Sequence, residues 1–175
     1  MKAIGYVGAL VAAIVLSVAV WNYSSAFGPV NEVVQSDARN FGISVWAHFD
    51  DYVDSSVLVF DLRTVSGSSS RADVFRVFLQ SANRLKASEF KTVKLAFDGR
   101  PKFLIQGAYF KKLGDEYETQ NPVYTMRTFT ENVYRLDGTR AYAEWTGGWL
   151  GVLQKEMEQF NTFHDDWYLN DLTRR

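Results

Sequence analysis

The chain has 175 residues, 47% of them hydrophobic and 15% aromatic, which is enough for one folded domain with a substantial core. Its formal net charge of −1 argues against a nucleic-acid-binding protein, because neutralising phosphates needs a clear excess of Lys and Arg. Cysteine is absent, which excludes disulfide frameworks, cysteine-type zinc sites, thiol nucleophiles and an acylated lipoprotein cysteine.

The amino-terminal segment is uncharged from Ala3 to Trp21 and almost purely apolar. As a helix it would be about 28 Å long, which matches the hydrocarbon core of a bilayer. Lys2 precedes the segment, whereas acidic residues outnumber basic ones just after it. Because positive charge stays on the cytoplasmic side, the pattern predicts a transmembrane signal anchor over residues 1–22, with a single domain over residues 23–175 outside, in the periplasm or the extracellular space.

A cleaved signal peptide is the alternative for this segment. Ser24, Ser25 and Ala26 offer small residues for signal peptidase, and cleavage near Ala26 would release a secreted domain. The apolar run is longer than the 7 to 15 residues usual in a signal peptide, which favours the uncleaved anchor.

Small residues recur every fourth position of the apolar segment, at Gly5, Ala9, Ala13 and Ser17. Such a ridge lets a second helix approach closely, so it is a candidate for helix association within the membrane. Alanine and glycine are also common in export segments in general, so the spacing of small residues can equally reflect ordinary composition without helix association.

The middle of the chain predicts a short surface helix from Pro29, a strand over 57–62 with both faces covered, and a helix beginning after Ser70. Ser70 and Asp73 have the spacing of a capping box, and apolar residues at helical spacing form a stripe at Val74, Phe75, Phe78, Leu79, Ala82 and Leu85. Arg76, Gln80 and Arg84 lie on the opposite side of this helix, which we expect to face outward.

A β-hairpin is predicted over 92–105, with its turn at Asp98-Gly99. A three-residue loop would pair Leu95 with Phe103 and place both on the core face, whereas a two-residue loop would break that match. Residues 108–113 fit either a longer strand or a helix. The remainder predicts a helix over 121–133 ended by Asp137-Gly138, a strand over 139–145, and a long final helix with an apolar repeat at Leu150, Leu153, Met157, Phe160 and Trp167.

This order of elements indicates an α+β domain, with a mixed α/β domain possible, built on a small sheet with packed helices. Both histidines lie beside acidic pairs: His48 before Asp50 and Asp51, and His164 before Asp165 and Asp166. These are ligands for a metal site, yet their spacing matches no metal motif, and His164 falls where the apolar repeat expects a core residue. We therefore predict no cofactor and no metal site.

Charge is segregated along the chain. Residues 71–112 contain ten Lys or Arg against three Asp or Glu, and both flanking regions are net acidic. The helix and hairpin patterns place five of these cations on outward faces, as a candidate anion-binding surface: Arg76, Arg84, Lys94, Arg100 and Lys102. Its partners would be an anionic envelope surface or an acidic protein; alternatively, the acidic flanks fold back and pair with the basic middle.

Two functions remain open at this point. The first is a membrane-anchored extracytoplasmic binding or assembly module of the cell envelope. The second is a membrane-tethered hydrolytic enzyme that uses His48 and nearby carboxylates. The first is preferred because an enzyme of this size usually carries a recognisable motif, and the sequence contains none.

Overall fold

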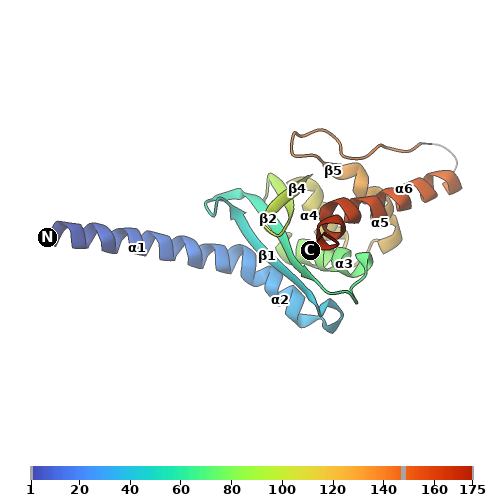
Figure 1. The fold of residues 1–175 in the computed structure, drawn as a ribbon. Coiled ribbons are helices and arrows are strands. Elements are labelled where there is room, and N and C mark those ends of the chain that lie inside the picture. The colour runs from blue at the N-terminus through green and yellow to red at the C-terminus, as the bar shows by residue number, and fades with distance from the viewer. Residues whose placement is uncertain (1, 147–148, 175) are drawn as a thin grey trace.

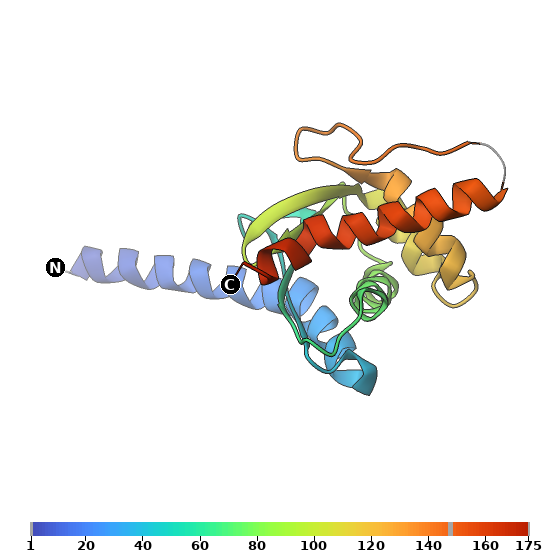
Figure 2. The same cartoon turned by 45° about the vertical axis from the view of Figure 1, so that its right-hand side comes forward.

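A five-stranded mixed sheet with helices on one face follows a long apolar helix in the computed structural model, which describes residues 2–146 and 149–174 (Figure 1). The expected α+β class is confirmed. Figure 2 shows α1 (Lys2–Asn22) extending away from the rest of the domain, whereas α2 (Gly28–Ser36), which continues it, packs beside β1 (Ile43–Asp50) and α3 (Arg71–Leu85).

The apolar helix α1 continues without a break into the domain. Helix α1 (Lys2–Asn22) passes through one π-helical turn, η1 (Tyr23–Phe27), into α2 (Gly28–Ser36), with helical backbone angles at both junctions. The predicted helix from Pro29 exists and lies at the surface, with Glu32, Gln35 and Ser36 exposed and Val30 and Val33 buried against the core. One unbroken helix thus joins the apolar segment to the domain.

The sheet has the order β1-β2-β3-β4-β5, formed by β1 (Ile43–Asp50), β2 (Asp54–Val65), β3 (Thr92–Phe97), β4 (Arg100–Gln106) and β5 (Val133–Tyr134). All neighbouring pairs are antiparallel except β2 and β3, whose parallel connection is helix α3 (Arg71–Leu85). Strand β2 confirms the predicted strand over 57–62 and extends it at both ends. Strand β1 was not predicted, although its alternate residues are buried.

Helix α3 begins as its sequence predicts. Ser70 is the N-cap, and its side chain and that of Asp73 form the reciprocal bonds of a capping box. The predicted apolar stripe is buried throughout. Phe78 lies at the centre of the core, in ring contact with Phe60 of β2 and Trp167 of the last helical segment, so helices and sheet share one aromatic cluster.

The predicted hairpin register is confirmed, with Leu95 opposite Phe103 and Val93 opposite Ile105. The predicted loop is wrong, however, because Phe97 pairs with Arg100 and leaves only Asp98 and Gly99 in the turn, both with positive φ. A β-bulge between these pairs adds Lys102 to β4 and restores the register that a two-residue loop alone would shift.

The carboxy-terminal third departs most from the predicted elements. Residues 107–116 form helix α4 (Gly107–Glu116) rather than more strand; a Cβ on Gly107 would lie 1.7 Å from the Phe90 carbonyl oxygen, so only glycine fits that approach. The predicted helix over 121–133 is too long: α5 (Pro122–Phe129) is followed by a 3₁₀ turn, and Val133 belongs to β5.

The predicted strand over 139–145 is also wrong, since its paired residue in the described chain is Arg140, in an isolated bridge to Tyr134. The predicted final helix is confirmed as α6 (Trp149–His164), which continues through the π-helical turn η4 (Asp165–Leu169) into α7 (Asn170–Leu172). Phe160 and Trp167 of its apolar repeat are buried, Leu153 and Met157 are half-buried, and the side chain of Leu150 lies outside the described residues.

Candidate functional site

A cleft of about 410 Å³ opens on the helical side of the domain, between the start of α3, helix α5 and the final helix. We call it the methionine cleft, and its lining residues are Ser69, Ser70, Arg71, Ala72, Met126, Met157, Phe160, Asn161, Tyr168 and Leu169. Ligand sites are commonly concave, of this volume, and apolar with a few polar groups. Methionine side chains adapt to the shape of a bound group, because they are unbranched and polarisable.

Arg71 brings charge to one side of the methionine cleft. Its guanidinium forms an ion pair of 2.5 Å with Asp165, and each side chain is 40% exposed. The Nε atom of Arg71 is buried and has no hydrogen-bond partner among the described residues. Because Nε is closed to solvent, an acceptor brought by a ligand would meet the exposed part of the guanidinium instead.

His164 lies beneath the cleft, fully buried among aromatic rings that include Phe160 and Tyr168. Its Nδ1 is 2.9 Å from the Phe160 carbonyl oxygen, which requires a proton on Nδ1, and its Nε2 has no partner in the described chain. Burial lowers the pKa of His164 to about 4, and the nearby Arg71 cation acts in the same direction. His164 is therefore a neutral core group at pH 7.

Tyr168 forms another wall of the cleft. Burial raises the pKa of its hydroxyl well above the usual value of 10, so the phenol stays protonated at physiological pH. The cleft thus combines methionine and aromatic surface with a guanidinium and a neutral phenol, and this arrangement suits binding of a partly apolar group that carries a hydrogen-bond acceptor.

The predicted anion-binding residues lie in two separate places. Arg76 and Arg84 lie on α3, with Gln80 between them, and the row contacts residues 32–40. Arg76 donates to Asn40 and to the Arg39 carbonyl oxygen, and only 19% of its side chain is exposed. The expectation that this row faces outward is wrong for Arg76, because the chain after α2 covers it.

Lys94, Arg100 and Lys102 come from the hairpin. Lys94 pairs with Asp50 at 2.5 Å, and Lys102 pairs with Asp171 at 2.7 Å. The hydrogen bond from Lys102 lowers the pKa of Asp171. Arg100 is exposed at the turn and lines a hollow of about 240 Å³ together with Asp98, Asp171 and Arg174.

Acidic residues from both flanks therefore fold onto the basic middle: Glu32 and Asp50 from one side, Asp165 and Asp171 from the other. This is the pairing that the sequence offered as the alternative to a free anion-binding surface. Binding of an external anion by the five predicted residues remains a prediction. Within the described residues, Arg100 is the member of this set that forms no ion pair.

The two histidines lie in different surroundings. His48 lies on β1, where its ring stacks on Tyr52 with centroids 4.7 Å apart and its Nδ1 is 2.8 Å from the Phe49 carbonyl oxygen. His164 lies in the aromatic core of the final helix. Within the described residues, no three His, Asp or Glu side chains gather in a way that could hold a metal ion.

Of the predicted association ridge, Ala9, Ala13 and Ser17 lie on the exposed helix α1, where the Ser17 hydroxyl donates to the Ala13 carbonyl oxygen. The surroundings of Gly5 lie outside the described residues. Association through these positions remains a prediction.

Comparison with protein-family models, with curated proteins and with solved structures found no significant match. The methionine cleft was not predicted from the sequence. Met157 and Phe160 belong to the apolar repeat of the final helix, but no local pattern indicates that a cleft opens between this helix, α3 and α5.

Proposed function

We propose that the chain is a single-pass membrane protein of the cell envelope, with its amino terminus in the cytoplasm and its domain outside, and that the domain is a binding or assembly module. The observation that carries the anchor is the exposure of α1. Its apolar side chains, such as Leu10 (62%), Leu16 (65%) and Val20 (65%), are more than half exposed on a helix long and apolar enough to cross a membrane.

Exposure of such a helix to water is costly, because each large aliphatic side chain gains about 1.5–3 kcal/mol on leaving water. A bilayer removes that cost along the whole of α1. The position of Lys2 before the helix and of the acidic residues after it supports the proposed orientation.

Retention of the anchor, rather than cleavage near Ala26, is supported by the packing of the chain around that residue. Ala26 is fully buried, as is Val30 one turn later. Cleavage there would also remove Asn22, whose side-chain oxygen accepts from the Phe49 N–H at 2.9 Å. A domain cut after Ala26 would lose part of its own core and one buried hydrogen bond.

For the binding role we propose the methionine cleft as the site, and a protein partner that inserts an apolar side chain flanked by a carboxylate. Met126, Met157 and Phe160 would contact the apolar group, and Arg71 would receive the carboxylate. Insertion of one apolar anchor into a pocket is a common source of affinity at protein interfaces.

The anchor and its orientation are tested by fusing a reporter that is active only in the cytoplasm after Arg175. We expect a silent reporter and a membrane-bound protein of full-length mass. Reporter activity would contradict the orientation, and a mass reduced by the first 26 residues would contradict the retained anchor.

The binding site is tested by NMR of the methionine methyl groups, because the chain has only three methionines and two of them line the cleft. Full-length protein in lipid nanodiscs is titrated with short peptides that pair one apolar side chain with one carboxylate. We expect the Met126 and Met157 signals to shift while that of Met1 does not.

A matched pair of variants distinguishes loss of Arg71 at the cleft from loss of a positive charge elsewhere on the surface. Arg71→Gln should weaken peptide binding about tenfold or more, the loss expected for one charge-assisted hydrogen bond. Arg63→Gln is the control, because Arg63 also pairs with an aspartate, Asp61, and is 41% exposed against 40% for Arg71. Equal binding by both variants would contradict the assignment of the cleft.

A further inference from the structure

Apolar side chains gather where α1 meets the sheet. We call this group the junction patch: Trp21 and Tyr23 from the helix, Trp46 from β1, and Tyr52 and Val53 from the turn between β1 and β2. All five are exposed, Tyr23 and Val53 by 61%. Ring contacts join the helix to β1, Trp21 with Phe49 and Phe27 with both Tyr23 and Trp46.

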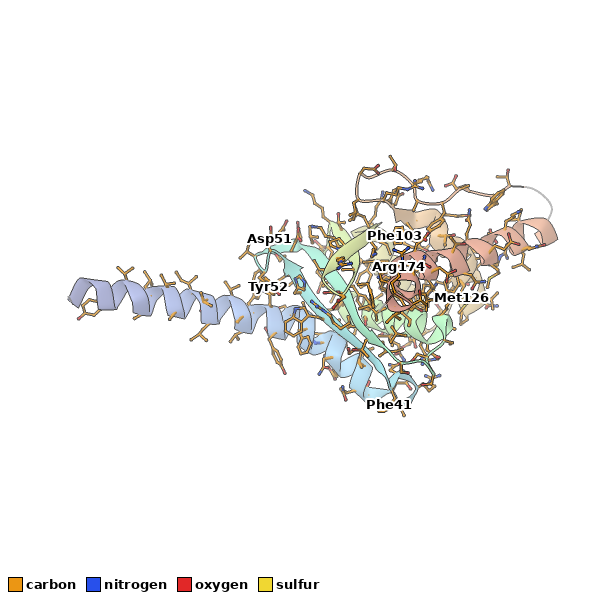
Figure 3. All side chains as sticks on the ribbon, in the orientation of Figure 1. Phe41, Asp51, Tyr52, Phe103, Met126 and Arg174 are labelled. Carbon is orange, nitrogen blue, oxygen red and sulfur yellow. The ribbon has the colours of Figure 1, made fainter. Side chains whose placement is uncertain are left out.

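Hydrogen bonds fix the β1–β2 turn to the last residue of α1. The buried side chain of Asn22 donates to the Tyr52 carbonyl oxygen at 2.6 Å and accepts from the Phe49 N–H at 2.9 Å. Figure 3 shows Asp51 and Tyr52 at the end of the hairpin nearest to α1, and Phe41 beyond the other end of β1. The turn is therefore held at the level of Asn22.

The length of α1 indicates at what depth of the membrane Asn22 would lie. The 21 residues of α1 span about 31 Å, which is close to the thickness of a bilayer's hydrocarbon core. If α1 crosses the membrane, Asn22 lies at the boundary between hydrocarbon and headgroups, and the turn beside it lies there too. Tyr and Trp are enriched at this boundary, because their rings are apolar and their polar atoms reach water.

The turn itself has an uncommon backbone. Asp51 and Tyr52 have φ values of 47° and 63°, a left-handed conformation that is unusual for a residue as bulky as tyrosine. With the Val53 N–H bonded to the Asp50 carbonyl oxygen, these two residues form the type I′ turn that suits the twist of a β-hairpin. Here the conformation leaves Tyr52 and Val53 exposed at the tip of the hairpin.

We propose that the tip of the β1–β2 hairpin inserts into the headgroup layer of the membrane that α1 crosses. This inference rests on the proposed anchor and adds a second contact to it. A zwitterionic surface fits best, because the tip carries the exposed carboxylate of Asp51 and would be repelled by anionic headgroups. Helix and hairpin together fix the orientation of the domain, with α3 and α5 on the side away from the protruding part of α1 (Figure 2).

The test uses the absence of cysteine, which makes any introduced cysteine a unique labelling site. Three full-length variants carry an environment-sensitive fluorophore at one position each: Val11→Cys within α1, Val53→Cys at the tip, and Phe41→Cys. Phe41 is the matched control, since it is 87% exposed at the other end of β1. The proteins are reconstituted into phosphatidylcholine vesicles with and without brominated acyl chains.

We expect brominated lipid to quench the label strongly at Val53, by about twofold, and to leave the label at Phe41 unchanged, because quenching requires contact with the lipid. The label at Val11 should be quenched most. Quenching at Val11 with equal, unquenched labels at Val53 and Phe41 would overturn the tip contact while the anchor stands. An unquenched label at Val11 would overturn the anchor and, with it, this inference.

Discussion

Acid should destabilise the domain through His164. The folded protein holds this side chain neutral, with a pKa of about 4, whereas the unfolded chain binds a proton at about 6.5. Because the folded pKa is depressed, the unfolded state binds more protons between these values. The associated stability is fully present above pH 6.5 and is lost as the pH falls toward 4.

The size of the effect follows from the two pKa values. Linkage gives a loss of about 2 kcal/mol in the free energy of unfolding between pH 7 and pH 5 from this one group. That is a large part of the 5–15 kcal/mol typical of a domain, so it should be visible in the denaturation midpoint. Carboxylates with lowered pKa values, such as Asp37 and Asp73, lose their protons below this window and contribute little within it.

The assay is urea unfolding of the detergent-solubilised full-length protein at pH 7 and pH 5, followed by tryptophan fluorescence. His164→Phe is the comparison, because it fills the aromatic site without a titrating group, and all other groups cancel in the difference. We expect the wild-type protein to lose about 2 kcal/mol more than the variant. Equal losses would refute the conclusion that His164 is buried and neutral.

Three further outcomes are expected. Phe78→Ala should lower the free energy of unfolding by about 3–5 kcal/mol, whereas Phe41→Ala should change it by less than about 0.5 kcal/mol, because the first side chain is fully buried and the second is 87% exposed. Gly114→Ala should lower the thermal midpoint, because its Cβ would lie 2.3 Å from a backbone oxygen of α3; an unchanged midpoint would contradict this helix packing. Lys94→Glu should cost about 1 kcal/mol by opposing Asp50, and adding Asp50→Lys should restore most of it, as a double-mutant cycle in urea would show.

Local patterns by themselves determined much of the secondary structure. The capping box at Ser70 and the apolar stripe after it predicted helix α3, because both depend on residues within a few turns. The uncharged run after Lys2 predicted a long apolar helix for the same reason. The pairing of Leu95 with Phe103 was also predicted, since burial requires both on one face.

Tertiary structure decided what distant segments do to one another. The bulge at Lys102 and the burial of Val30 depend on packing against residues far away in the sequence, and a local pattern contains no information on such contacts. The charge pairing, the methionine cleft and the contact between α1 and the β1–β2 turn also depend on distant residues. Charges that looked free in the sequence are paired with acidic residues from both ends of the chain. The methionine cleft and the bond from Asn22 to Tyr52 exist only because the fold brings separate elements together, so only the three-dimensional arrangement could reveal them.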